Sequence, residues 1–145
     1  MKPRAAWPIL AKKAKEKCDQ AMAALVKGRE KIKNLEQSRS RMEALYADYL
    51  ARSIETEKKS LRMQETENFR GFLQQIQTLI KRVDIDLQHA KFELDILKSN
   101  LLAAEKKRIQ METLQEQDER RIRDAAAKRE QREMDATGVM LFNMR

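Results

Sequence analysis

The fold is decided by the stretch FRGFLQQIQTLIKRVDIDLQHAKFELDILKSNLLAA, residues 69–104. Its apolar residues recur at alternating intervals of four and three, the heptad spacing of a helix that packs along a second helix. With Leu73 placed at heptad position a, every a and d position is apolar. The a positions are Leu73, Ile80, Leu87, Leu94 and Leu101, and the d positions are Phe69, Ile76, Val83, Ala90, Leu97 and Ala104. This spacing predicts a coiled coil.

Residues 11–50 follow the same heptad less regularly. Its a positions are Ala11, Cys18, Leu25, Ile32, Arg39 and Tyr46, and its d positions are Ala14, Ala21, Gly28, Leu35, Met42 and Tyr49. Only Gly28 and Arg39 are not apolar. The side chains are small at the start and large at the end, and small side chains bury little apolar area. The first part of this helix should therefore hold its partner weakly.

Residues 51–68 join the two patterns and carry no apolar stripe, Gly or Pro. We expect the chain to reverse somewhere within 54–67, which gives an all-α fold. This fold is a single antiparallel two-helix coiled-coil hairpin over residues 1–145. The predicted elements are helix one at about 9–53, helix two at about 67–135 with Gly138 as its C-cap, and a short apolar tail at 139–145. The second helix is longer, so helix one covers it only to about residue 112.

The composition agrees with long helices. Of 145 residues, 37% are charged and 5% are aromatic, with three Gly and two Pro. High charge also occurs in disordered chains, but here the strong helix formers are periodic. The net charge of +8 is concentrated in residues 1–33, where ten Lys and Arg face three acidic residues. This region is either a solvated helix face or a docking surface for a protein, nucleic acid or anionic membrane.

No residue pattern indicates catalysis, a metal site or a cofactor. Cys18 is the only cysteine and His89 the only histidine, and His89 falls on the outer face of the helix. The three glycines are isolated, so no phosphate-binding loop is present, and a hairpin offers no concave pocket for a substrate. No apolar run reaches the roughly 20 residues of a membrane span, and no signal peptide is evident, so we expect a cytoplasmic protein that is not an enzyme.

Three sets of apolar residues lie outside the predicted helix–helix interface. Phe72 and Leu79 occupy g positions near the reversal, where they either widen the interface or offer a protein-binding patch. Ile85, Phe92 and Ile96 lie on the face away from the partner helix and indicate a second contact. The tail VMLFNMR, residues 139–145, either frays or docks.

Four segments follow one another in a recognisable order: YADY (46–49), NFRGFLQQIQTLI (68–80), LLAAEKKRIQMETLQEQDERR (101–121) and AAAKREQREMDATGVMLF (125–142). Their order resembles the FliJ family, the small coiled-coil proteins of the flagellar type III export apparatus. Injectisome stalk proteins of the YscO type are similar as well. The resemblance covers most of the chain and implies an antiparallel coil like the central stalk of rotary ATPases.

The resemblance also implies partners and a location. Family members bind the hexameric export ATPase with the two chain ends of the coil, bind the cytoplasmic domain of the export-gate membrane protein, and handle export chaperones. We therefore expect a monomer that associates peripherally with the inner membrane. It would serve flagellum biogenesis and thereby motility and chemotaxis.

By matching position, the resemblance places the export-gate interface at Met42, Leu45, Tyr49, Phe72, Ile76, Leu79 and Val83. It places the ATPase-ring interface at Lys12, Lys13, Lys15, Lys17, Arg120, Arg121, Arg123 and Arg129. Phe72 and Leu79 are the cleaner tests of gate binding, because Met42, Tyr49 and Ile76 also belong to the predicted helix–helix interface. The competing hypotheses are an injectisome stalk protein, a basic coiled coil that binds nucleic acid or membrane, and a structural homodimer.

Overall fold

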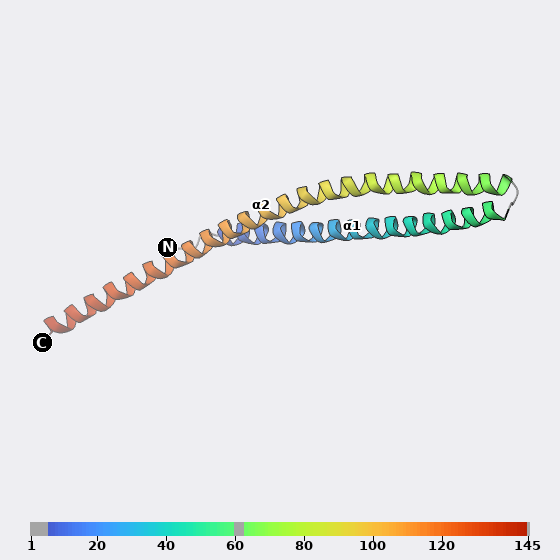
Figure 1. Cartoon of the computed structure of the whole chain (residues 1–145). Coiled ribbons are helices and arrows are strands. Elements are labelled where there is room, and N and C mark those ends of the chain that lie inside the picture. The colour runs from blue at the N-terminus through green and yellow to red at the C-terminus, as the bar shows by residue number, and fades with distance from the viewer. Residues whose placement is uncertain (1–5, 60–62, 145) are drawn as a thin grey trace. The chain divides into compact units, whose positions relative to one another are not determined.

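The structure is a computed structural model that describes residues 6–59 and 63–144. Helix α1 spans Ala6–Lys58 and helix α2 spans Met63–Asn143 (Figure 1), and the described residues contain no strand. The all-α hairpin with a longer second helix is thereby confirmed. The reversal, expected within 54–67, falls between Lys59 and Met63, and residues 60–62 lie outside the described residues.

Helix α1 extends past the predicted end at about residue 53, because nothing in its last turns breaks a helix. The Thr56 hydroxyl donates a hydrogen bond to the Arg52 carbonyl oxygen at 2.8 Å. The Arg52 guanidinium also pairs with the Asp48 carboxylate at 3.3 Å, one turn earlier. Such pairs support a helix from within. Helix α2 likewise begins before the predicted residue 67.

Helix α2 also extends beyond its predicted end, so Gly138 is not a C-cap and residues 139–143 are helical rather than a tail. A glycine inside a helix costs about 1 kcal/mol, which neighbouring helix formers such as Met140 and Leu141 offset. The Thr137 hydroxyl donates to the Glu133 carbonyl oxygen at 2.9 Å, which holds the preceding turn. Arg145, the last residue of the expected tail, lies outside the described residues.

Contacts divide the chain into two compact units. The turn unit comprises residues 23–99, that is, the second part of α1 and the first part of α2. The terminal unit joins the beginning of the chain, through Met22, to the segment from Asn100 to the end. Each unit is described separately below.

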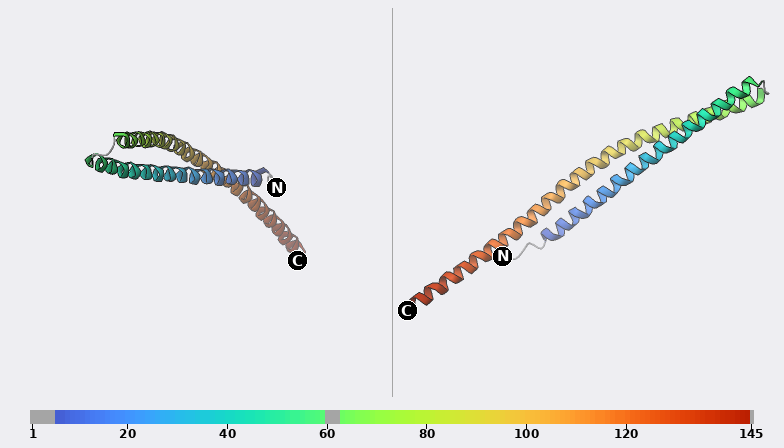
Figure 2. Two further views of the ribbon diagram at one scale, coloured as in Figure 1. Left: turned by 90° about the vertical axis from the view of Figure 1, so that its right-hand side faces the viewer. Right: turned by 60° about the horizontal axis from the view of Figure 1, so that its bottom comes forward.

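In the turn unit α1 and α2 lie side by side and run in opposite directions, as both views of Figure 2 show. Residues that come later in α1 contact residues that come earlier in α2. The pairs are Lys31 with Glu93 at 3.7 Å, Arg39 with Asp84, and Tyr46 with Gln77 at 3.1 Å. This register is antiparallel.

The helix–helix interface of the turn unit is made of the predicted a and d residues, all of which are buried or half-buried. Its buried apolar members are Leu25, Leu73, Ile76, Val83, Leu87 and Ala90. Gly28 fits this interface because a Cβ atom there would lie 2.9 Å from Cδ1 of Leu97 and 3.3 Å from Cδ1 of Leu94. The interface continues beyond the predicted residues to Ser53, which is buried.

Arg39, the charged exception at an a position, is accommodated by ion pairs. Its guanidinium donates to the Asp84 carboxylate on α2 and to the Glu43 carboxylate one turn along α1. The hydrogen bond to Asp84, followed by the charge of Asp84, raises the pKa of Arg39. The long Arg side chain thus reaches the edge of the interface while its charge stays partly in water.

In the terminal unit the interface is thinner. Ala11 and Ala14 are buried against Met111, with Trp7 and Leu114 packed around them. Cys18 is a buried free thiol near Arg108. Arg108 donates to Glu112 at 3.1 Å, and this hydrogen bond is the main reason why the pKa of Arg108 is raised. Beyond Ala125, α2 is exposed at every described residue.

Candidate protein-binding surface beside the turn

Three aromatic rings gather in the turn unit near the reversal of the chain. Tyr49 on α1 and Phe69 on α2 occupy d positions, whereas Phe72 stands beside them at a g position. The ring centroids of Tyr49 and Phe72 are 4.4 Å apart, and those of Tyr49 and Phe69 are 6.2 Å apart. The Arg52 guanidinium carbon lies 5.5 Å from the Tyr49 centroid, close enough for a cation–π interaction. The rings therefore fix one another in place.

The same rings line a shallow groove of about 300 Å³. Its walls are Tyr49, Phe69 and Phe72, and its rim carries the polar side chains of Glu65 and Asn68. An apolar floor with a few polar groups at its edge is the usual make-up of a site that receives one side chain of a partner. The sequence did not identify Glu65, because helix two was expected to begin near residue 67.

The residues expected to face the export gate divide into three groups by burial. Ile76 and Val83 are buried against α1, so their side chains belong to the helix–helix interface. Met42 and Tyr49 are half-buried. The exposed members are Leu45, Phe72 and Leu79, with exposed fractions of 41%, 36% and 44%.

Leu45, Phe72 and Leu79 form what we call the g-face patch. All three occupy g positions, and in an antiparallel pair the g positions of the two helices lie on the same flank of the interface. Their apolar surface adjoins the aromatic groove through Phe72. Leu50, Ile54 and Met63 are further exposed apolar side chains in this unit. Ile54 and Met63 were missed because residues 51–68 show no periodic stripe.

The residues expected to face the ATPase ring all lie in the terminal unit and are all exposed. They are Lys12, Lys13, Lys15 and Lys17 on α1 and Arg120, Arg121, Arg123 and Arg129 on α2. Consecutive positions point in different directions around each helix, so the eight charges do not form one patch. Arg120 pairs with Glu116 at 3.3 Å.

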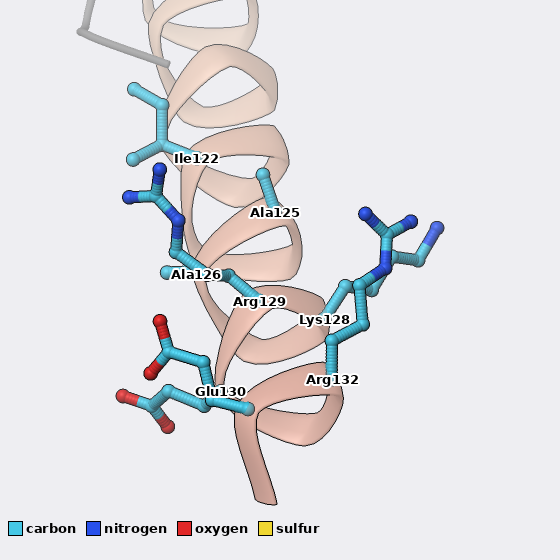
Figure 3. Close-up of a pocket in the computed structure, with 8 residues that line it drawn as sticks. Ile122, Ala125, Ala126, Lys128, Arg129, Glu130 and Arg132 are labelled. Carbon is cyan, nitrogen blue, oxygen red and sulfur yellow. The ribbon is translucent and has the colours of Figure 1, made fainter. Parts of the chain in front are cut away.

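Figure 3 shows the charged surface of α2 beyond Ile122. Lys128 and Arg132 project together from one side of the helix, whereas Arg129 and Glu130 project from the other. The helix presents alternating charges to its surroundings here, which suits recognition by a charged partner.

Residues 9–145 match the FliJ family, described as the flagellar FliJ protein. The chain is a member of the FliJ family. The resemblance inferred from the sequence is therefore confirmed, and the protein is a component related to flagellar export. Neither a search of curated proteins nor a search of solved structures gave a match.

No helix within residues 6–59 and 63–144 combines the length and apolarity that crossing a bilayer would take. Within the same ranges, no three His, Cys, Asp or Glu side chains gather in a way that could hold a metal ion.

Proposed function

We propose that this FliJ-family chain is a stalk-like coupling protein of flagellar export. Its turn unit binds the cytoplasmic domain of the export-gate membrane protein, and its terminal unit binds the hexameric export ATPase. The chain transmits force or position and carries out no chemical step of its own. The observation that carries the proposal is the g-face patch beside the aromatic groove.

Gate binding is supported by the separation of folding and binding residues in the turn unit. Ile76 and Val83 fill the helix–helix interface, whereas Leu45, Phe72 and Leu79 remain exposed next to it. Exposed apolar groups clustered beside a groove usually mark a protein interface, and aromatic residues contribute most to such interfaces. The gate protein would place an apolar side chain against Phe72.

A matched pair of variants tests gate binding. Phe72→Ala should weaken binding of the gate's cytoplasmic domain by at least about tenfold, because an aromatic anchor is lost. Phe92→Ala, which removes an exposed phenylalanine elsewhere on α2, should leave this affinity unchanged. Calorimetric titration measures both, and far-UV circular dichroism confirms that both variants remain helical. Equal affinities for the gate domain in Phe72→Ala and the unmodified chain would refute the assignment.

ATPase binding is supported by the exposed, charged end of α2 and by the family to which the chain belongs. Interfaces that depend on charge weaken when one sign is reversed and when salt is added. Arg123→Glu combined with Arg129→Glu should lower the affinity for the export ATPase, and Arg70→Glu in the turn unit should not. An ATPase affinity that is insensitive to both changes would place the contact elsewhere.

The remaining expectations belong to the same proposal. The chain acts as a monomer in the cytoplasm, associates with the inner membrane through its partners, and assists export chaperones. Light scattering of the purified chain tests the monomer, and cell fractionation with and without the gate protein tests the membrane association. Binding of nucleic acid or anionic vesicles that persists in the Phe72→Ala variant would favour the basic coiled-coil alternative.

A further inference from the structure

A second apolar stripe runs along α2 on the face opposite α1. Ile85, Phe92 and Ile96 are 55%, 69% and 47% exposed. In the isolated chain, the apolar surface of these large side chains is in contact with water. One of them alone would need no explanation, but three lie within twelve residues and on one face.

The spacing of this outer stripe is that of a coiled-coil interface. Ile85, His89, Phe92 and Ile96 follow one another at intervals of four, three and four residues. These are the intervals at which the helix–helix interface itself is built, shifted to the opposite side of the same helix. In the described turn unit α1 packs on the other face, so the stripe is open to a third helix.

Within residues 85–96, the charges at the positions that flank the outer stripe are acidic, whereas the basic Lys81 and Arg82 precede the stripe. Asp86 and Glu93 border it on one side, and Gln88 and Asp95 border it on the other, as the helical positions of these residues require. Glu93 makes only a long, exposed pair with Lys31 at 3.7 Å. Within the described residues, Asp86 and Asp95 form no ion pair.

Charge complementarity selects the occupant. Residues that flank a coiled-coil stripe meet the flanking residues of the partner helix and set its identity. A second copy of the stripe would bring acid against acid. We infer that the outer stripe binds an amphipathic helix of another protein whose apolar residues repeat at intervals of three and four and are flanked by Lys or Arg. This surface is separate from the g-face patch and does not depend on gate binding.

A pair of designed peptides probes this surface on the full chain. Both peptides carry Leu at a and d positions; the basic peptide has Lys at e and g, and the acidic peptide has Glu there. The basic peptide should bind the unmodified chain, more weakly as salt rises, and the acidic peptide should not bind. Fluorescence anisotropy of a labelled peptide measures both affinities. Equal affinity for the two peptides would overturn the charge argument.

Variants locate the binding. Ile85→Ser combined with Phe92→Ser should weaken basic-peptide binding by at least about tenfold, whereas Phe72→Ser should leave it unchanged. Because the substituted side chains are exposed, the helical signal and the melting temperature should not change. A basic peptide that binds the double variant as tightly as the unmodified chain would overturn the proposal. So would a dimer of the unmodified chain that Phe92→Ser abolishes, since a second copy would then cover the stripe.

Discussion

The turn unit and the terminal unit share one heptad spacing but fill it with different side chains. The turn unit buries Leu, Ile and Val, and the terminal unit buries Ala11, Ala14, Cys18 and Met111. Since stabilisation follows the apolar area removed from water, the turn unit should be the more stable of the two. Regions with few buried apolar contacts open first. We therefore expect the two helices to separate less readily in the turn unit than in the terminal unit.

The largest expected effect comes from breaking the interface of the turn unit. Ile76 is only 2% exposed, so Ile76→Ala should lower the free energy of unfolding by about 3 kcal/mol. Ile85→Ala removes the same atoms from an exposed position and should change it by no more than about 0.5 kcal/mol. Urea unfolding followed by circular dichroism measures both values. Similar losses in the two variants would contradict the assignment of Ile76 to the interface.

A smaller and more local effect is expected in the terminal unit. Met111→Ala should cost about 2 kcal/mol, the low end for a buried methionine, because its small alanine neighbours give the side chain few apolar contacts to lose. Hydrogen exchange should accelerate more than tenfold for amides around Ala14 and Met111 while amides around Ile76 keep their rates. Met134→Ala, at an exposed position of α2, serves as the control. Equal acceleration in both units would mean that they open together.

Gly28 lies in the close-packed helix–helix interface, whereas Gly71 lies on open surface. A Cβ atom at Gly71 would meet nothing within 4 Å, so Gly71→Ala should stabilise the chain by about 0.5–1 kcal/mol through helix propensity. At Gly28 the same gain is opposed by the contact at 2.9 Å with Leu97. Thermal melting should therefore rank Gly71→Ala above Gly28→Ala, and the reverse order would show that α1 and α2 are not in close contact at Gly28.

The smallest effect concerns the ion pair between Arg39 and Asp84. The pKa of Arg39 is raised, so the stabilisation that its charge provides is present below its unfolded-state pKa and is lost only in strongly alkaline solution. Salt is therefore the better probe. Asp84→Asn should lower the melting temperature slightly at low salt and not at high salt, because the pair is partly exposed. Asp86→Asn is the control. The same change in melting temperature in both variants would show that the ion pair between Arg39 and Asp84 does not contribute to stability.

The heptad reading predicted most of the interface because a and d positions follow from spacing alone. It could not foresee how Arg39 is accommodated, since Asp84 lies on the other helix and the pairing depends on the register. It also understated the interface after residue 104. Arg108, Gln115 and Asp118 keep to a and d positions and are buried or half-buried, although their polarity hides the pattern.

The candidate surface was predicted only in part, for a physical reason that concerns the reversal. Residues 51–68 contain no Gly or Pro, so the helix ends left no trace in the sequence and Glu65 appeared to lie outside a helix. The groove requires Glu65 and Asn68 on the same helix as Phe69 and Phe72. Helix-breaking residues would have marked the boundary, and their absence concealed the groove.

The central claim is that separate residues of the turn unit perform folding and binding. Calorimetric titration of the gate's cytoplasmic domain with the Leu79→Ser chain, together with urea unfolding of that chain, tests it most directly. We predict an affinity at least about tenfold weaker, with a free energy of unfolding within about 0.5 kcal/mol of the unmodified chain. Unchanged affinity accompanied by a large loss of stability would contradict the claim, because Leu79 would then serve the helix–helix interface.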